Sequence, residues 1–272
     1  MTELVTTSTD GTSVTALDNG SGPTLLLVHG GGGDATSWDG VIRSLIDDFR
    51  VVRVTRRVYV PGASIPPTYS MAVEAADVLA IAGLLDRPVL LVGQSSGAVA
   101  ALEAALMAPE MFAGLFLYEP PMPTRSLVGG EAAWRAREAL AAGDPGEAMR
   151  IHLRDIVQVP AELVETLIAD PKAQAAFAAK AAGQVADIDA LDALGVGVDR
   201  FRRLDVPTTL VEGDMSPAHL RERLADLAVT LPSARVLTLA GQGHAAHLTA
   251  PEVLANAIRE VAERVLCSED RH

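Results

Sequence analysis

Short apolar runs alternate with longer amphipathic stretches along most of this chain. Residues 24–29, 51–55, 88–92, 115–118, 208–212 and 235–239 form runs of the length expected for strands. Several of these runs are apolar at nearly every position, which is typical of strands buried on both faces of a parallel sheet. Two further candidate strands, 5–7 and 13–17, flank an Asp-Gly pair at 10–11 that predicts a hairpin at the edge of the sheet.

Apolar residues recur at helical spacing between these runs. They are Met71, Val78, Ile81 and Leu85 before the run at 88–92, Val99, Leu102 and Leu106 after it, and Leu254, Ile258, Val261 and Val265 in a last helix over 251–266. Alternating strands and helices predict an α/β fold with a mostly parallel central sheet that is flanked by helices.

This alternation stops between the sixth and seventh of the predicted strands. Prolines 120, 121 and 123 open a segment whose pattern indicates short helices at 131–142, 146–157, 161–169 and 171–181. We therefore predict a core made of residues 1–120 and 205–272, with a helical insertion over 121–204.

Composition limits the classes of function. The chain has 272 residues, 49% of them hydrophobic, and a mean hydropathy of +0.25, so it can bury a large core. Its net charge of −13 argues against nucleic acid or an anionic membrane as partner. The single cysteine, Cys267, excludes an internal disulfide and a cysteine-based metal site. Because neither a signal peptide nor a membrane-spanning run is evident, we expect a cytoplasmic protein, monomeric or homodimeric, that acts on a small molecule.

One heptapeptide carries the first chemical signal. Residues 92–98 read V-G-Q-S-S-G-A, in which Gly93, Ser95 and Gly97 fit G-x-S-x-G between a predicted strand and a predicted helix. Such a strand-to-helix turn exposes its serine as a nucleophile, and the backbone N–H of Ser96 is then the natural oxyanion donor.

A glycine-rich loop follows the run at 24–29 and allows two interpretations. Gly30, Gly32 and Ala35 fit G-x-G-x-x-[G/A], and Arg56 with Arg57 after the next strand could hold the 2′-phosphate of NADP. Alternatively, H-G-G-G at 29–32 is an oxyanion loop in which Gly31 N–H is the second donor. We favour the second interpretation, because it also explains the serine motif.

Three motifs together resemble the α/β-hydrolase superfamily: H-G-G-G at 29–32, G-Q-S-S-G at 93–97 and G-Q-G-H at 241–244. The resemblance implies the α/β-hydrolase fold, a helical cap formed by the insertion, and no cofactor or metal. It also implies that His244 is the catalytic base, because G-x-G-H matches the family there and not at His247. We expect His29 to be structural and to hold the glycine loop by hydrogen bonds. His152 and His219 stand in no motif, and we expect them on the surface or in the cap.

The acid is less clearly indicated. The superfamily usually has an acid about three residues after the glycine that ends the seventh strand, but here Asp214 follows Gly213 directly and Ser216 stands at the usual spacing. We assign Asp214 as the acid and keep Glu119, after the sixth strand, as the alternative.

The predicted function is that of a serine hydrolase with the triad Ser95, His244 and Asp214 and an oxyanion hole made by Gly31 and Ser96. Gly30, Trp38 and Glu119 are candidate substrate contacts, and Leu, Val, Met and Ala should line most of the pocket because only 4% of residues are aromatic. The substrate class is a small, largely apolar ester, lactone or related carbonyl compound. Non-hydrolytic rearrangement, carbon–carbon bond hydrolysis and ligand binding on the same framework stay open, and an NADP-dependent oxidoreductase is a distant alternative.

Overall fold

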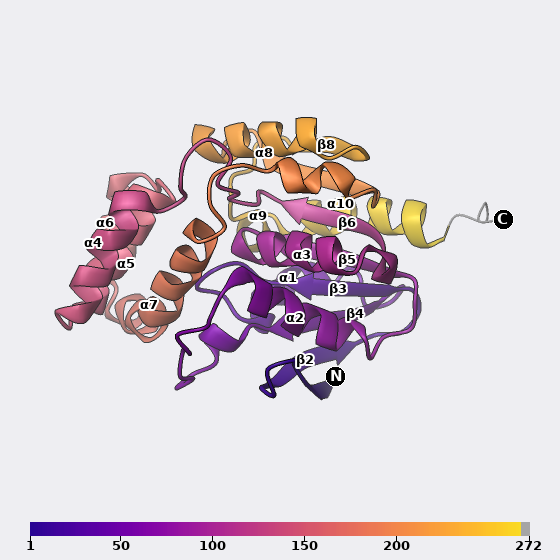
Figure 1. Cartoon of the computed structure of the whole chain (residues 1–272), viewed down its shortest axis with the longest axis horizontal. Coiled ribbons are helices and arrows are strands. Elements are labelled where there is room, and N and C mark those ends of the chain that lie inside the picture. The colour runs from indigo at the N-terminus through magenta and orange to yellow at the C-terminus, as the bar shows by residue number, and fades with distance from the viewer. Residues whose placement is uncertain (268–272) are drawn as a thin grey trace.

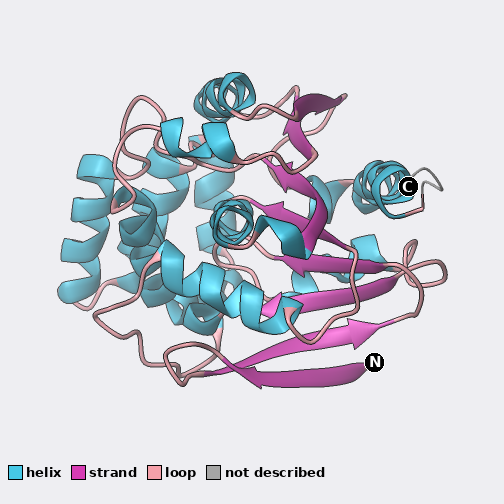
Figure 2. Cartoon of the chain, turned by 45° about the vertical axis from the view of Figure 1, so that its right-hand side comes forward, coloured by secondary structure: helices cyan, strands magenta, loops and turns pink. Residues whose placement is uncertain are grey.

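One twisted sheet forms the centre of the molecule and is antiparallel only at one edge (Figure 2). The computed structural model describes residues 1–267, and of residues 167 and 168 only the backbone. Within this range the strand order is β1-β2-β4-β3-β5-β6-β7-β8, and all pairs from β4 to β8 are parallel. The strands are β1 (Thr2–Thr7), β2 (Ser13–Asn19), β3 (Thr24–Val28), β4 (Arg50–Thr55), β5 (Val89–Gln94), β6 (Phe112–Tyr118), β7 (Thr208–Gly213) and β8 (Ala234–Leu239).

Helices cover both faces of the sheet, and each face has its own apolar core. One core includes Met71 and Val78 from α2, Leu102 from α3 and Leu224 from α8. The opposite core includes residues of α1, α9 and α10. The bounds are α1 (Asp39–Ile42), α2 (Met71–Ala82), α3 (Ser96–Met107), α8 (Ala218–Thr230), α9 (Ala246–Thr249) and α10 (Pro251–Leu266), with short 3₁₀ turns η1 (Ala35–Trp38), η2 (Arg57–Tyr59), η3 (Pro109–Met111) and η5 (Asp199–Arg203).

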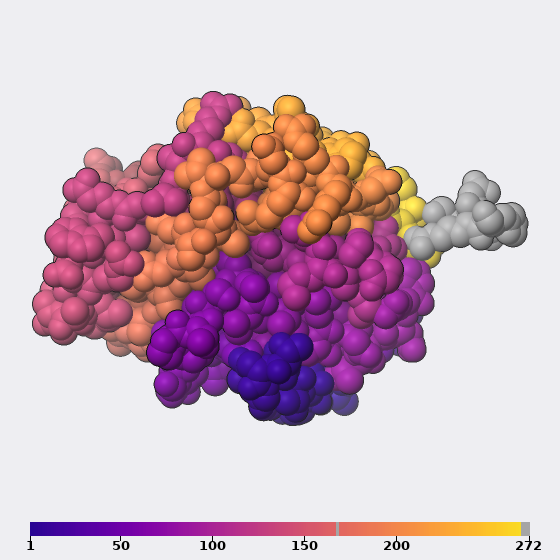
Figure 3. All heavy atoms as spheres, in the orientation of Figure 1, coloured from indigo at the N-terminus to yellow at the C-terminus, as the bar shows by residue number. Residues whose placement is uncertain are grey.

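The segment between β6 and β7 is helical and lies beyond the carboxyl ends of the parallel strands, at the left of Figure 1. It consists of α4 (Gly130–Ala141), α5 (Pro145–Ile151), the π-helical turn η4 (His152–Ile156), α6 (Ala161–Ala169) and α7 (Pro171–Asp192). In the space-filling view it forms one continuous body with the strand-bearing part (Figure 3). Ligands of open parallel sheets bind at the carboxyl ends of the strands, so this segment lies where a site is expected.

The sequence pattern predicted every strand and most helices, and it was wrong about two features of the insertion. The helix expected at 146–157 is divided, because α5 ends at Ile151 and continues as the π-helical turn η4. The helix expected at 171–181 extends to Asp192. Gly183 interrupts its pattern, since glycine weakens a helix, but here a Cβ would lie 2.3 Å from the carbonyl oxygen of Val58. Glycine thus lets α7 approach the core closely.

Among the residues that the structure describes, no helix combines the length and the apolar character that a membrane crossing requires.

Candidate active site

Ser95 occupies the sharp turn between β5 and α3. Its backbone has φ 54° and ψ −131°, a conformation that side-chain-bearing residues rarely adopt. The flanking glycines are needed for packing: a Cβ on Gly93 would lie 2.5 Å from Ala98 Cα, and one on Gly97 would lie 2.2 Å from His29 O. The structure therefore has the strained strand-to-helix turn that the motif predicted.

The glycine loop after β3 lies against this turn. A Cβ on Gly30 would come within 3.0 Å of Ser95 Cβ, and one on Gly31 within 2.7 Å of the Gln184 amide nitrogen. Gly31 thus lies between the strand-bearing core and helix α7. Ser96 is the first residue of α3, where backbone N–H groups have no partner inside the helix. The loop and the helix start can together present N–H groups to an oxygen that carries negative charge.

His29 is buried and holds the glycine loop. Its Nδ1 lies 2.8 Å from Gly30 O, and its Nε2 accepts the backbone N–H of Arg56 at 3.3 Å. Burial, together with the nearby charge of Arg56, lowers the pKa of His29 to about 3, so the ring is neutral at pH 7. With both ring nitrogens engaged in this way, His29 has the structural role that we expected.

His244 lies in the loop after β8, and Glu119 is its carboxylate partner. The Nδ1 atom of His244 is 2.6 Å from Glu119 Oε2, while Glu119 Oε1 accepts the backbone N–H of Gly213 at 2.7 Å. Glu119 is fully buried and has a positive φ of 46°. The Tyr118 hydroxyl donates to Gly243 O, and Gln94 Nε2 donates to His244 O at 3.3 Å. The loop of His244 is therefore fastened both to β6 and to the residue before Ser95.

The expected contact between Asp214 and His244 is not formed, so this assignment is corrected. Asp214 is exposed, and its Oδ1 accepts the backbone N–H of Gly241 at 2.7 Å. The physical reason is a tight turn after β7: Ser216 N–H bonds Gly213 O at 3.1 Å and directs the Asp214 side chain outward. Glu119 takes the position beside the imidazole, and it is not among the residues that line the cavity, so its assignment as a substrate contact is also corrected.

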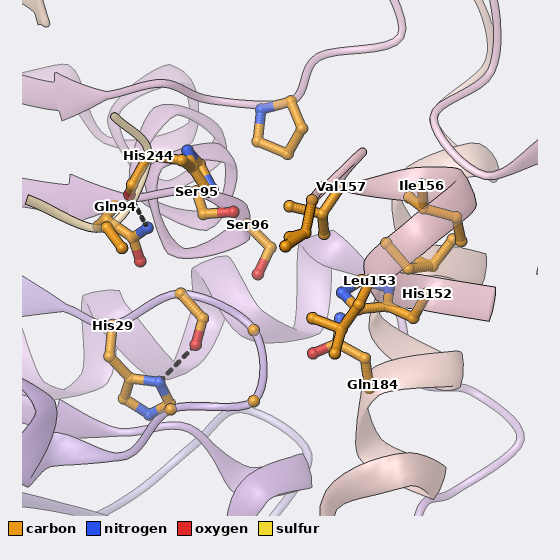
Figure 4. Close-up of a pocket in the computed structure, with 18 of the residues that line it drawn as sticks. His29, Gln94, Ser95, Ser96, His152, Leu153, Ile156, Val157, Gln184 and His244 are labelled. Carbon is orange, nitrogen blue, oxygen red and sulfur yellow. Dashed lines mark hydrogen bonds between the residues drawn. The ribbon is translucent and has the colours of Figure 1, made fainter. Parts of the chain in front are cut away.

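A cavity of about 470 Å³ separates these loops from the helical insertion. Figure 4 shows Ser95, Ser96 and His244 on one side and Leu153, Ile156 and Val157 on the other. The apolar lining is Trp38, Pro121, Val128, Leu153, Ile156, Val157, Val159, Phe177, Ile188, Leu191, Leu220, Ala245 and Leu248. Leucine and valine are frequent in this lining, as expected, but isoleucine and Phe177 were not expected, alanine occurs once, and no methionine is among these residues.

Other expected contacts have mixed outcomes. Gly30 and Trp38 line the cavity, but Trp38 is 1% exposed, so it serves mainly as a core anchor. The other tryptophan of the chain, Trp134, lies in α4 of the insertion and is exposed. His152 lies in the helical insertion, as expected, but it is buried there and lines the cavity. His219 is half-buried in α8 and also lines the cavity, so its expected position on the surface or in the insertion was wrong.

Sequence reasoning also missed Gln184, a buried residue of α7 that lines the cavity. The sequence did contain a signal for a buried polar site on this helix: Gln184 is a polar residue in an alanine-rich stretch, three positions before an aspartate.

Neither arginine after β4 is free to bind a phosphate. Arg56 is buried in ion pairs with Glu74 at 2.9 Å and Asp187 at 2.6 Å. Arg57 pairs with Asp77 and with Asp10. The NADP interpretation required at least one of these guanidinium groups at a nucleotide site, so this geometry contradicts it.

A family model described as the alpha/beta hydrolase family matches residues 25–257. The chain belongs to this family. An alpha/beta hydrolase from Sphaerobacter thermophilus superimposes with a TM-score of 0.81 at 29% identity, covering 94% of this chain and 99% of that one. A thermophilic esterase from Thermogutta terrifontis has the same fold, with a TM-score of 0.77 at 24% identity over 97% and 99% of the two chains.

Among curated proteins, the chain is 39% identical over 102 residues to a pimeloyl-[acyl-carrier protein] methyl ester esterase from Methylococcus capsulatus. That match spans 36% of this chain and 37% of the esterase, about a third of each. Family membership and relatives of this kind support a hydrolase.

Proposed function

We propose that the protein is a serine hydrolase that cleaves small, largely apolar esters or lactones through an acyl-enzyme. Ser95 is the nucleophile, His244 the base and Glu119 the acid, and the N–H groups of Gly31 and Ser96 bind the oxyanion. The observation that carries this proposal is the contact between buried Glu119 and half-buried His244, which lies beside a strained serine turn at one apolar cavity. A base held by a third group, next to a nucleophile, is the arrangement that covalent catalysis requires.

The proposed reaction uses His244 twice. Glu119 accepts the hydrogen of Nδ1, so Nε2 keeps a free lone pair that takes the proton of Ser95 as its oxygen attacks the carbonyl carbon. The negative charge on the carbonyl oxygen is bound by the two N–H groups until the intermediate collapses and His244 returns the proton to the departing alkoxide. Water then attacks the acyl-enzyme by the same steps, and the acid product and free Ser95 are released.

The helical insertion, residues 121–204, is the proposed cap, and residues 1–120 and 205–272 are the proposed core. The insertion contributes Leu153, Ile156 and Phe177 to the cavity wall, whereas the core contributes the reacting groups. A mostly apolar cavity favours substrates with an aliphatic acyl or alcohol part, because burying that part stabilises the complex. The volume of about 470 Å³ limits the substrate to a small molecule.

Labelling with a fluorophosphonate probe tests the nucleophile, followed by hydrolysis of p-nitrophenyl butyrate. We expect label on the peptide that contains Ser95, and we expect Ser95→Ala to lose both label and hydrolysis. The matched control is Ser13→Ala, since Ser13 is exposed at the start of β2, and this variant should keep both.

Two results would oppose this proposal in different ways. Folded protein that takes no label at Ser95 contradicts the nucleophile assignment. Protein that is labelled at Ser95 but hydrolyses none of a panel of esters and lactones supports the non-hydrolytic alternative on the same framework.

A further inference from the structure

Helix α7 turns one polar stripe toward the core rather than toward solvent. Gly183, Gln184 and Asp187 lie on the side of the helix that meets the segment after β4, and Asp187 is fully buried. The cavity is lined by Gln184, but Asp187 lies behind it, outside the lining. Burying a carboxylate destabilises the fold unless several hydrogen-bond donors surround it. The donors around Asp187 therefore indicate its role.

Four side chains donate to the Asp187 carboxylate: Tyr69 Oη at 3.4 Å, and three closer donors from the turn after β4 and the start of α3. Arg56 donates through Nη2 to Oδ1 at 2.6 Å, Ser96 Oγ donates to Oδ2 at 2.6 Å, and Tyr59 Oη donates to Oδ2 at 2.8 Å. Burial alone would raise the pKa of Asp187, but the charge of Arg56 and these hydrogen bonds outweigh burial and lower it. The group is therefore a carboxylate at neutral pH.

Each of the three close donors belongs to the frame of the oxyanion hole. Ser96 is the residue after the nucleophile, and its own N–H is one proposed oxyanion donor. Arg56 Nη1 also donates to Ser96 Oγ at 2.9 Å and to His29 O at 3.4 Å, next to the glycine loop. The Tyr59 hydroxyl lies against the glycine loop, 3.1 Å from the position that a Cβ on Gly31, the second proposed donor, would take.

We propose that Asp187 is a positioning residue for the reaction. Through Ser96, Arg56 and Tyr59 it holds the two oxyanion donors in the geometry that binds the oxygen. Catalysis therefore requires that α7 packs against the core. This inference rests on the proposed serine-hydrolase function. It gives the helical insertion a role in the chemical step in addition to enclosing the substrate. Preorganised donors act mainly on the transition state, where the oxygen carries its full charge.

The test is Asp187→Asn. The amide keeps the volume and one acceptor oxygen, but its NH₂ group now faces donors of Arg56, Ser96 or Tyr59. Removal of a whole oxyanion donor lowers kcat about 10²–10³-fold, so misplacement of the donors should lower kcat about 10–100-fold and leave KM within about threefold. Hydrolysis of p-nitrophenyl butyrate measures both constants.

Asp77→Asn is the matched control for the loss of a buried ion pair. Asp77 is 1% exposed, pairs with the neighbouring Arg57, and belongs to α2 rather than to the site. This variant should lose stability to urea, as Asp187→Asn does, and keep kcat within about twofold. If kcat falls in Asp187→Asn but not in Asp77→Asn, the loss comes from misplaced oxyanion donors and not from a less stable protein.

Ser96→Ala provides an independent test, because it removes the hydroxyl and keeps the N–H. Ser96→Ala should lower kcat by itself. In the double variant with Asp187→Asn, the fold loss of kcat should be smaller than the product of the two single losses, because both substitutions break the same hydrogen bond. If Asp187→Asn does not fold, Ser96→Ala and Tyr59→Phe take its place, and both should lower kcat without raising KM.

Equal kcat in Asp187→Asn and Asp77→Asn would overturn the inference, as would unchanged kcat in both Ser96→Ala and Tyr59→Phe. In either case, label on Ser95 and loss of activity in Ser95→Ala would still support the proposed function. Absence of that label would instead remove the basis of both.

Discussion

Replacing Glu119 by glutamine should nearly abolish turnover without unfolding the protein. Glu119 Oε1 accepts the Gly213 N–H at 2.7 Å, and the amide oxygen of glutamine can keep that bond. The NH₂ group then faces His244 Nδ1, which the native carboxylate oxygen contacts at 2.6 Å. An NH₂ group donates, so Nδ1 must accept and the imidazole proton moves to Nε2. In that tautomer His244 cannot take the proton of Ser95.

In a serine protease triad the wrong tautomer of the histidine lowers kcat about 10⁴-fold, and here we expect about 10³–10⁴-fold, or roughly 4–5.5 kcal/mol in the activation barrier. The assay is hydrolysis of p-nitrophenyl butyrate, with thermal unfolding measured on the same samples. Asp214→Asn is the control, because its exposed side chain accepts only from Gly241 among the described contacts and asparagine can do the same. Its kcat should stay within about threefold of the wild type. If Asp214→Asn loses activity while Glu119→Gln retains it, the assignment of the acid from contacts is refuted.

Three further predictions concern packing, pH and cooperation. Gly97→Ala should lower the free energy of unfolding by about 2–3 kcal/mol in urea, because its Cβ would lie 2.2 Å from the rigid carbonyl of His29; an unchanged midpoint would contradict this packing. Burial lowers the pKa of His152 to about 4, so only the unfolded state takes up this proton as pH falls below about 6.5, and stability is lost by roughly 2 kcal/mol at pH 5. His152→Gln should remove that part of the pH dependence, and an identical slope in wild type and variant would refute it. Ser95→Ala and His244→Ala should each remove nearly all turnover, and the double variant should lose little more; multiplying losses would argue against a shared step.

The parts of the fold that local pattern determines could be predicted from the sequence. Strands such as β3 and β5 are apolar at almost every position, so burial on both faces identifies them without knowledge of their neighbours. The serine turn was predictable for a similar reason, since Gly93 and Gly97 are required by backbone contacts within a few residues or on the adjacent strand.

Features that depend on distant segments were not predictable in this way. Asp187 lies 131 residues from Arg56, and no local period shows that an aspartate in an alanine-rich helix will meet a buried guanidinium. The same holds for the acid, because the direction of the Asp214 side chain is set by a turn of a few residues after β7. Loop geometry of this kind depends on contacts with the chain around Gly241, which the spacing of residues does not encode.

The proposed acid, Glu119, follows β6 rather than β7, and its position explains how the imidazole of His244 still has a carboxylate partner. Strands β6 and β7 are parallel neighbours, and Glu119 N–H bonds Val211 O at 2.9 Å, so the ends of both strands lie beside the loop of His244. A carboxylate after either strand can therefore face Nδ1. An acid after β6, however, directly precedes the helical insertion, and movement of that insertion would disturb it. Arg223 opposes such movement, because its guanidinium binds Met122 O at 2.7 Å and Ser126 O at 2.9 Å, which ties the start of the insertion to α8. The contacts of Arg223 thus hold the chain that follows Glu119 against α8, and they support the position of the carboxylate beside His244.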